Sequence, residues 1–322
     1  MLANLFLWLS AIALLGLSMS IAPWYRLWPF ELIGGAYLWL AALTLLFFLG
    51  SLWLRPKRSR RGVMVVLAIA LGFYASATLS SYIPRLWNAQ PGGIPLTVMT
   101  YNVNYLLWNT EAVTERVKNQ SAEILGLIEP SDEEAEALRV RVEGLYPYYY
   151  RATDGRLSLF SHHPIVEAET EDFGASNFGL TAIVDVDGKP IRVVVAHPRP
   201  PVSPALFTRR NLFIQALANY SASQETPTII MGDFNTTSWS PYFREFVWQS
   251  GLRSVNRGHG LNPTWFYNEA GRPLATIEQV LQVLKIPIDH IFVSSRISVD
   301  AVMTPPAGVS DHRPVVAKLR IR

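Results

Sequence analysis

The sequence predicts a layered α/β domain preceded by three membrane-spanning helices. Three long apolar runs without a charged residue lie within the first 90 of 322 residues. After them, short Val- and Ile-rich runs alternate with helical patterns and are bounded by polar or Gly/Pro turns, which is typical of stacked strands and helices. Only 16% of the residues are charged, against about 25% in ordinary soluble domains. This composition excludes a disordered or fibrous chain and disfavours an ordinary soluble enzyme.

The apolar runs cover residues 4–22, 32–54 and 63–82. Each is long enough to cross a hydrocarbon core of about 30 Å at about 1.5 Å per residue. Buried core helices are the alternative, and for the first run so is a cleavable signal peptide. We favour membrane spans, because three such runs would otherwise need a core without polar partners. The predicted membrane region is residues 1–83.

The charge distribution predicts the topology. Of 28 basic and 25 acidic residues, seven basic and one acidic lie in the first 90, so residues 91–322 carry 21 basic and 24 acidic. Five of the basic residues form the loop RPKRSRR at 55–61, and such loops stay cytoplasmic. We therefore expect a multi-pass integral membrane protein with its N-terminus in the cytoplasm and its C-terminal domain outside it, joined by a Pro/Gly-rich tether at 84–95.

The C-terminal domain, residues 96–322, has no broad basic surface to suggest a polyanion partner, since its net charge is negative. The chain has no cysteine, which excludes disulfides and thiolate metal sites. Strands are predicted at 96–101, 124–128, 157–161, 180–186, 191–196, 228–231, 288–293 and 313–320. Helices are predicted at 110–120, 132–143, 204–222, 241–249 and around 276–284.

Polar residues follow or flank the predicted strands. They are Asn102, Glu129, His197, Asp233, Asn235, Asp289, His290, Asp311 and His312. Each of them alone is more typical of a turn, a cap or a solvated surface, but strand ends that meet at one sheet edge can assemble a site. Hard oxygen donors of this kind suit Mg²⁺ or Mn²⁺, and histidine can stabilise charge on a phosphoryl oxygen.

Taken in order, these residues stand in motifs that resemble the endonuclease/exonuclease/phosphatase superfamily, which has the deoxyribonuclease-I-like fold. The motifs are TYNVN (100–104), ILGLIEP (124–130), FSHHPI (160–165), AHPRPP (196–201), MGDFN (231–235), TW (264–265), IDHIFVS (288–294) and SDHRPVVA (310–317). The resemblance covers about residues 95–321 and is closest to bacterial membrane-anchored members. It implies a four-layered α/β sandwich of two packed mixed sheets, with the active site at one end.

The resemblance also implies roles for the acids and amides. Glu129 is the expected principal ligand of Mg²⁺ or Mn²⁺, assisted by Asn102. Asp233 is expected to orient or activate the attacking water, and Asn235 to hold the phosphate. Asp311 is the other carboxylate at the metal-water site, as base or ligand.

The histidines take the remaining roles. His312 is expected to donate to a non-bridging phosphate oxygen, and Asp289 to fix its tautomer. His197 is expected to contact the phosphate, whereas His290 is expected to be structural. Three arginines near His197 are candidates for a local phosphate clamp, namely Arg199, Arg209 and Arg210.

The chain departs from the family pattern at Ile128, where many members have Gln, and at His162, where Arg is frequent. The segment 266–287 is long and is a candidate specificity loop. These departures leave the substrate open without removing an expected metal ligand.

The leading function is therefore a membrane-anchored, metal-dependent phosphoesterase acting on lipid headgroups or other small phosphoesters by in-line attack of water. An extracytoplasmic nuclease acting on DNA or RNA is the alternative. A catalytically silent tethered binding domain is a further one, and the apolar spans hold no charged residue that would mark a transport pathway. The expected partners are the lipid bilayer and a phosphoester substrate, and the sequence identifies no protein partner.

Overall fold

The computed structural model describes residues 23–54, 92–153, 156–174, 177–265, 285–306 and 310–322, with Gly308 and a few single residues between 5 and 83. The chain divides into two compact units. The first comprises Met1–Ser80 with Ser238–Arg244, and the second Ser81–Thr237 with Glu245–Arg322.

In the first unit, a short 3-10 helix, η1 (Pro23–Arg26), precedes α2 (Trp28–Gly35) and α3 (Tyr37–Leu54). The predicted span 32–54 therefore falls on two helices, with the break directly after two glycines. Among the described residues no single helix has the length and apolarity to cross a membrane, although α2 and α3 together do, with a bend of 68°. Most of the residues in the predicted spans 4–22 and 63–82 lie outside the described part of the chain.

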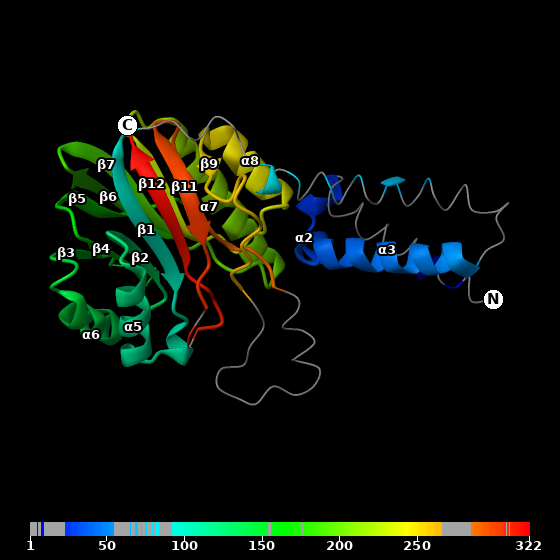
Figure 1. Ribbon diagram of the computed structural model, residues 1–322, viewed down its shortest axis with the longest axis horizontal. Helices are drawn as coiled ribbons and strands as arrows, with labels where there is room; N and C mark the ends of the chain where they lie inside the picture. Colours follow the sequence, from blue (N-terminus) through cyan, green and yellow to red (C-terminus); the bar gives the residue numbers. More distant parts are fainter. Residues whose placement is uncertain are drawn as a thin grey trace. The chain divides into compact units, whose positions relative to one another are not determined.

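The second unit contains two six-stranded mixed sheets (Figure 1). Sheet A has the order β11-β12-β1-β2-β4-β3. Its strands are β1 (Ile94–Asn102), β2 (Ile124–Ile128), β3 (Tyr148–Arg151), β4 (Leu157–Ser161), β11 (Ile297–Met303) and β12 (Val315–Ile321). Sheet B has the order β5-β6-β7-β8-β10-β9. Its strands are β5 (Ile165–Asp172), β6 (Phe178–Val186), β7 (Lys189–Ala196), β8 (Thr228–Asp233), β9 (Arg253–Ser254) and β10 (Asp289–Val293). The pairs β1–β2 and β7–β8 are parallel, and the other pairs are antiparallel.

Helices cover the outer faces of both sheets. The main core joins buried aliphatic residues of sheets A and B, and a second cluster packs α5 (Thr110–Gln120) and α6 (Asp132–Val142) against sheet A. On sheet B, α7 (Pro204–Ala222) and α8 (Pro241–Ser250) supply aromatic contacts. The ring centroids of Phe246 in α8 and Phe292 in β10, for example, are 4.8 Å apart. The predicted sandwich of two mixed sheets with helices is confirmed.

Local sequence explains where these helices begin. Asn109 caps α5 by accepting the Ala112 N–H at 2.9 Å. Ser131 and Glu134 form a capping box at α6, and Ser203 caps α7. Each cap satisfies an N–H that the helix leaves without a partner and stabilises the helix by about 1 kcal/mol. The predicted helices at 110–120, 132–143, 204–222 and 241–249 are confirmed within one residue at each end, whereas the one at 276–284 lies outside the described residues.

Two glycines allow the strands that carry the site to approach closely. A Cβ on Gly126 of β2 would lie 2.8 Å from Sδ of Met231 in the facing sheet. Gly232 of β8 has φ +154°, and a Cβ there would lie 1.9 Å from the backbone oxygen of Ala196 in β7. The backbone cannot give way at the second position, so that position requires glycine.

Candidate active site

The site lies at the edge where β1, β2, β7 and β8 end and β10 begins. Parallel strands end at the same edge of a sheet, which brings Asn102 beside Ile128 and places Glu129 next. In sheet B, antiparallel pairing sets Asp289, the first residue of β10, opposite Asp233, the last residue of β8. The residues that the sequence singled out at strand ends are thus brought together by topology.

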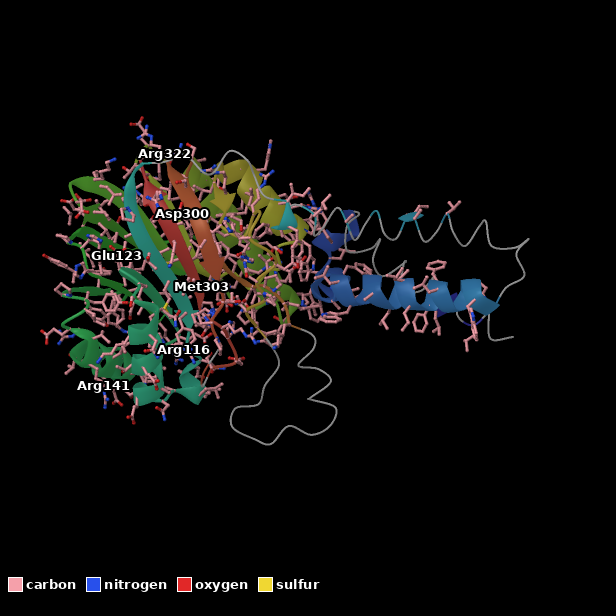
Figure 2. The ribbon with its side chains drawn as sticks, viewed as in Figure 1. Arg116, Glu123, Arg141, Asp300, Met303 and Arg322 are labelled. Carbon is pink, nitrogen blue, oxygen red and sulfur yellow. The ribbon has the colours of Figure 1, made fainter. Side chains whose placement is uncertain are left out.

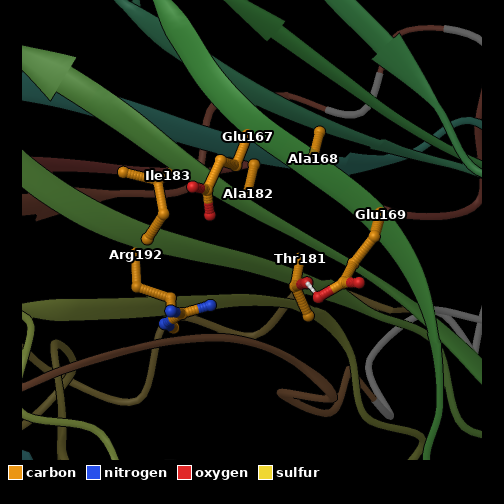
Figure 3. Close-up of a pocket in the computed structure, with 7 residues that line it drawn as sticks. All are labelled: Glu167, Ala168, Glu169, Thr181, Ala182, Ile183 and Arg192. Atoms are coloured by element: carbon orange, nitrogen blue, oxygen red, sulfur yellow. Dashed lines mark hydrogen bonds between the residues drawn. The ribbon is translucent and has the colours of Figure 1, made fainter.

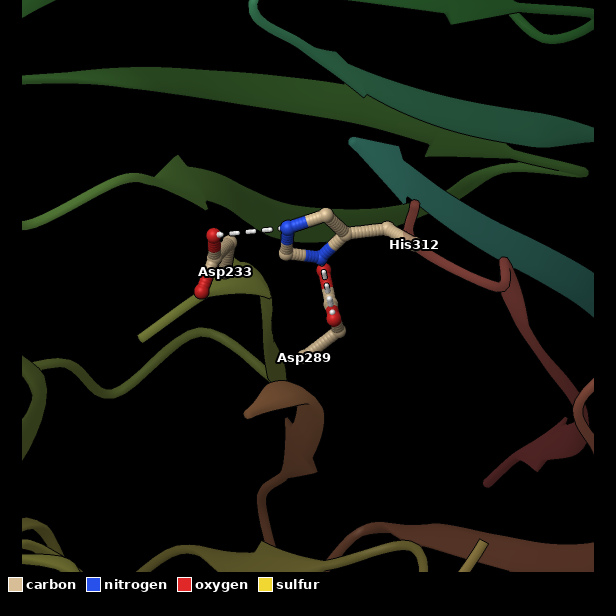
Figure 4. A group of neighbouring side chains, drawn as sticks. All are labelled: Asp233, Asp289 and His312. Carbon is tan, nitrogen blue, oxygen red and sulfur yellow. Dashed lines mark hydrogen bonds and ion pairs between the residues drawn. The ribbon is translucent and has the colours of Figure 1, made fainter. Parts of the chain in front are cut away.

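His312 and Asp289 form a buried pair (Figure 4). Nδ1 of His312 lies 2.8 Å from Oδ2 of Asp289. Because a carboxylate only accepts hydrogen bonds, we assign the proton to Nδ1. Burial lowers the pKa of His312, but the nearby acids, Asp289 first and then Asp233 and Asp311, together outweigh it and the pKa rises to about 10. The imidazole is therefore protonated at neutral pH, with Nε2 3.8 Å from Oδ2 of Asp233.

Asp233 has an unusually high proton affinity. Burial, followed by the nearby charge of Asp289, raises its pKa to about 8, while His312 opposes the rise. Its Oδ1 accepts the N–H of Asn235 at 2.9 Å, and its Oδ2 accepts Nδ2 of Asn102 at 3.1 Å. A carboxyl group with a pKa near the operating pH is suited to exchange a proton with water.

His197 lies between two carboxylates. Its Nε2 is 3.4 Å from Oε1 of Glu129 and 3.6 Å from Oδ2 of Asp233. Burial lowers the pKa of His197, although Glu129 acts in the opposite direction. The predicted neighbourhood of Asn102, Glu129, His197 and Asp233 is therefore one contact network, with a neutral imidazole in its centre.

Two hydrogen bonds fix the position of Asn235. Its Nδ2 donates to the backbone oxygen of Pro198 at 3.0 Å, and its own backbone oxygen accepts Nη1 of Arg210 at 2.8 Å. Arg210 is only 1% exposed and also donates to Oδ1 of Asn211. The hypothesis of a phosphate clamp that includes Arg210 is wrong, because this buried guanidinium supports the loop of Asn235 instead of facing a substrate.

Three of the seven described non-glycine residues with positive φ lie at the site. Asn104, Glu129 and Asn235 all have positive φ, at 47°, 65° and 48°. Such conformations cost of order 1–3 kcal/mol each in non-glycine residues and cluster at functional sites. For Glu129, a hydrogen bond from its N–H to the oxygen of Arg156 at 2.9 Å holds the strained geometry.

Asp311 sits apart from the His312 pair and is held by two residues for which the sequence indicated no role. Its Oδ1 accepts Nδ2 of Asn104 at 2.9 Å, and its Oδ2 accepts Nε1 of Trp265 at 3.0 Å. Asn104 belongs to the TYNVN motif and Trp265 to the TW motif, and these motifs were the sequence signal that could have pointed to the two residues. Their partner could not be read from the sequence, because it lies far away in the chain.

The remaining predicted positions are structural. His290 is fully buried and its Nε2 lies 2.9 Å from the backbone oxygen of Thr236. Ile128 is buried at the end of β2, and Nδ1 of His162 lies 3.2 Å from the backbone oxygen of Leu145. Most of the candidate specificity loop, residues 266–284, lies outside the described residues.

Among the described residues, one group of three His or acidic side chains is close enough to hold a metal ion: Asp233, Asp289 and His312, whose ligand atoms lie within 4.8 Å of one another. The predicted ligands Asn102, Glu129 and Asp311 are not in this group. Asn102 and Glu129 approach it through Asp233 and His197, and Asp311 is bound by Asn104 and Trp265.

A separate hollow lies on strands β5, β6 and β7 (Figure 3). It has a volume of about 260 Å³ and is lined by Glu167, Glu169, Thr181 and Arg192 with three apolar side chains. None of the predicted site residues lines it, so it is distinct from the histidine and acid cluster.

Comparison with known proteins supports the fold. The model of the Endonuclease/Exonuclease/phosphatase family matches residues 99–312. No curated protein matches the sequence. Among solved structures, sphingomyelinase C from Streptomyces griseocarneus is 16% identical with a TM-score of 0.52, over 70% of this chain and 99% of that one.

Two further structures are similar. An endonuclease/exonuclease/phosphatase from Bacteroides vulgatus is 18% identical with a TM-score of 0.56, over 71% of this chain and 100% of that one. A humanized D. rerio TDP2 with 14 mutations is 16% identical with a TM-score of 0.55, over 70% of this chain and 99% of that one. At these identities the likeness is one of fold.

Proposed function

The chain belongs to the endonuclease/exonuclease/phosphatase family, and from that membership we propose that it is a membrane-anchored, divalent-metal-dependent phosphoesterase. The observation that carries the proposal is the buried, protonated His312, held by Asp289 at 2.8 Å and facing Asp233. The positive charge of His312 can stabilise negative charge on a phosphoryl group, and the neighbouring Asp233 can exchange a proton with water.

The proposed reaction is in-line attack of water on the phosphorus atom. The water oxygen forms a new P–O bond, the P–O bond to the leaving group breaks with its electron pair on the leaving oxygen, and Asp233 in its ionised form takes the proton that the water gives up. Nε2–H of His312 donates to a non-bridging oxygen, where negative charge develops. Asn235 and His197 are proposed to orient the phosphoryl group, and Asp289 keeps His312 protonated.

The donors present fit a hard divalent cation. Glu129 has a side chain that is 26% exposed. Asn102 belongs to the same network through its Nδ2, which donates to Asp233, and its amide oxygen accepts the N–H of Asn104 at 3.0 Å. Burial and, after it, the nearby acids raise the pKa of Asp233, and a cation relieves the repulsion between the acids. We propose Glu129 and Asn102 as ligands of Mg²⁺ or Mn²⁺, with Asp311 as the additional carboxylate. When bound, the ion would neutralise phosphoryl charge and lower the pKa of water.

Lipid headgroups or other small phosphoesters are the proposed substrates. Residues 91–322 carry more acidic than basic residues. The labelled basic residues Arg116, Arg141 and Arg322 lie at separate places, with Glu123 and Asp300 between them in the view of Figure 2. An excess of acidic residues is unlike the continuous basic track of a nonspecific nuclease. One similar structure is named a sphingomyelinase, which favours the same substrate class.

Membrane anchoring is part of the proposal. It is supported by the three apolar runs at 4–22, 32–54 and 63–82 and by the bent pair α2–α3, which has the length and apolarity to span a bilayer. The basic sequence 55–61 supports an N-terminus in the cytoplasm. The catalytic unit then lies outside the cytoplasm, close to lipid headgroups.

The test is hydrolysis by the full-length chain in detergent with Mg²⁺ or Mn²⁺. Substrates are phospholipid and sphingolipid micelles, bis(p-nitrophenyl) phosphate, plasmid DNA and RNA, and His312→Ala is the inactive control. Lipid or small-ester turnover that His312→Ala loses supports the proposal. Cleavage of nucleic acid alone would favour the nuclease alternative, and hydrolysis of none of the substrates would favour a silent binding domain.

A further inference from the structure

The segment containing Thr264 and Trp265 connects two parts of the site through its backbone. Trp265 exchanges backbone hydrogen bonds with Ile286, at 2.9 and 3.0 Å, and forms a bridge with His312 on its other side. The N–H of Arg313 also donates to the oxygen of Thr264 at 2.7 Å. The segment therefore lies between the residues that enter β10 and the residues that enter β12.

The hydroxyl of Thr264 fixes the beginning of β10. Thr264 is fully buried, and its Oγ1 accepts the N–H groups of both Ile288 and Asp289 at 3.1 Å. Without the hydroxyl, two buried N–H groups would lose their acceptor, which is costly. This oxygen and the pairing of β10 with β8 together set the backbone of Asp289, which makes the 2.8 Å contact with His312.

The indole of Trp265 fixes Asp311. The donor Nε1–H binds Oδ2 at 3.0 Å while Nδ2 of Asn104 binds Oδ1 at 2.9 Å. One donor on each oxygen sets the plane of the carboxylate. If the indole N–H is removed, the carboxylate can turn about its remaining contact with Asn104.

We propose that Thr264 and Trp265 act as one positioning element, the 264–265 clamp, which holds the backbone of Asp289 and the carboxylate of Asp311. The inference rests on the proposed function, since positioning is measured by the hydrolysis that these acids support. Each clamp residue acts through an acid and does not touch the substrate.

The indole is tested by Trp265→Phe, which keeps an aromatic ring and deletes the donor. We expect kcat to fall about 10- to 100-fold with KM unchanged within about threefold, as for a misplaced catalytic group. Trp248→Phe on α8, where Trp248 is 81% exposed, is the matched control and should keep the original kcat. Retention of full kcat by Trp265→Phe would overturn the proposal.

A double-mutant cycle separates positioning from a general structural effect. In an Asp311→Ala background, Trp265→Phe should change the single-turnover rate by less than about twofold, because the side chain through which it acts is gone. A full additional loss in that background would contradict the proposal. If Trp265→Phe does not fold, Asn104→Ala releases the other oxygen of Asp311 and takes its place in the cycle.

The hydroxyl is tested without any substrate, so that failure of the proposed function remains distinguishable. The Nδ1–H proton between His312 and Asp289 gives a low-field NMR resonance in the full-length protein in detergent. Thr264→Val should shift or broaden this resonance, and Thr264→Ser should preserve it. An unchanged resonance in Thr264→Val would refute the clamp, even if the wild-type protein hydrolysed none of the phosphoesters tested.

Discussion

His312 and Asp289 are held 2.8 Å apart although they enter the site from different sheets. Asp289 begins β10 of sheet B, whereas His312 precedes β12 of sheet A. The two side chains are 7% and 0% exposed, so water does little to weaken their interaction. The charge on His312 is therefore a property of the packed sandwich and is lost when the sheets separate.

Asp289→Asn should shift the alkaline limit of activity. The wild-type pKa of about 10 lies above the ordinary 6.5, so the pair stabilises the fold fully below pH 6.5 and loses this effect as pH rises through 10. Without the Asp289 charge, burial depresses the pKa of His312, and the imidazolium is lost near or below neutral pH. Profiles of kcat/KM from pH 5 to 10.5 check this. A wild-type alkaline limb in Asp289→Asn would contradict it.

Glu129→Gln should weaken binding of the metal ion. The substitution keeps the shape of the side chain but removes the charge, and we expect at least about tenfold weaker binding of Mn²⁺. Isothermal titration calorimetry of the full-length protein measures the affinity without substrate. Glu133→Gln, at an exposed position of α6, is the control and should bind as the wild type does. Equal affinity in both variants would remove Glu129 from the metal site.

Gly232→Ala should destabilise the catalytic unit severely. Its Cβ would meet the backbone oxygen of Ala196 at 1.9 Å and would need a φ of +154°, so we expect a loss of at least about 3 kcal/mol in the free energy of unfolding, or no folding. Gly144→Ala, where a Cβ meets no atom within 4 Å, should remain close to wild type. Urea unfolding compares the two, and similar midpoints would argue against the close approach of β7 and β8.

His290 should make the fold sensitive to acid. Burial lowers its pKa to about 4 from 6.5, so the unfolded state binds more protons between these values. Stability is present above pH 6.5 and falls as pH drops through 4, by on the order of 3 kcal/mol. His290→Gln should flatten this dependence. Unfolding free energies at pH 7 and 4.5 test it, and an equal slope in both proteins would count against a buried neutral imidazole.

The topology can be tested by fusions. An alkaline phosphatase reporter after Arg322 should be active, because the catalytic unit is proposed to lie outside the cytoplasm, whereas the same reporter in the basic loop 55–61 should be inactive. A cytoplasmic reporter such as β-galactosidase at the same two positions should give the reverse pattern. Activity of alkaline phosphatase at 55–61 alone would invert the proposed orientation.

All eight predicted strands are present, and the four that the sequence did not predict, β3, β5, β9 and β11, are the four sheet edges. Central strands are buried on both faces and appear as Val and Ile runs such as TIIM. Edge strands are partly solvated, so β5 carries acids in IVEAETED and escapes the pattern. Because the site residues follow central strands, prediction was best where the chemistry lies.

The details of the site depended on tertiary contacts that spacing does not encode. Residue types and order pointed to His312, Asp289 and Asp233 together, but not to the bond from Trp265 to Asp311, 46 residues apart. Arg210 was misassigned because a helical pattern does not tell which arginine of α7 points into the protein. Similarly, an unbroken apolar run did not reveal the bend between α2 and α3.

The position of β12 has a consequence for biosynthesis. β12 pairs with β1 along seven residues and also with β11, so β1 emerges from the ribosome more than two hundred residues before its neighbour. Until then one edge of β1 presents unpaired backbone N–H and C=O groups, which are a template for aggregation. Pairing over such a sequence distance is also slow. Sheet A, and with it the site at its edge, therefore cannot be completed until β12 (Val315–Ile321) has been synthesised.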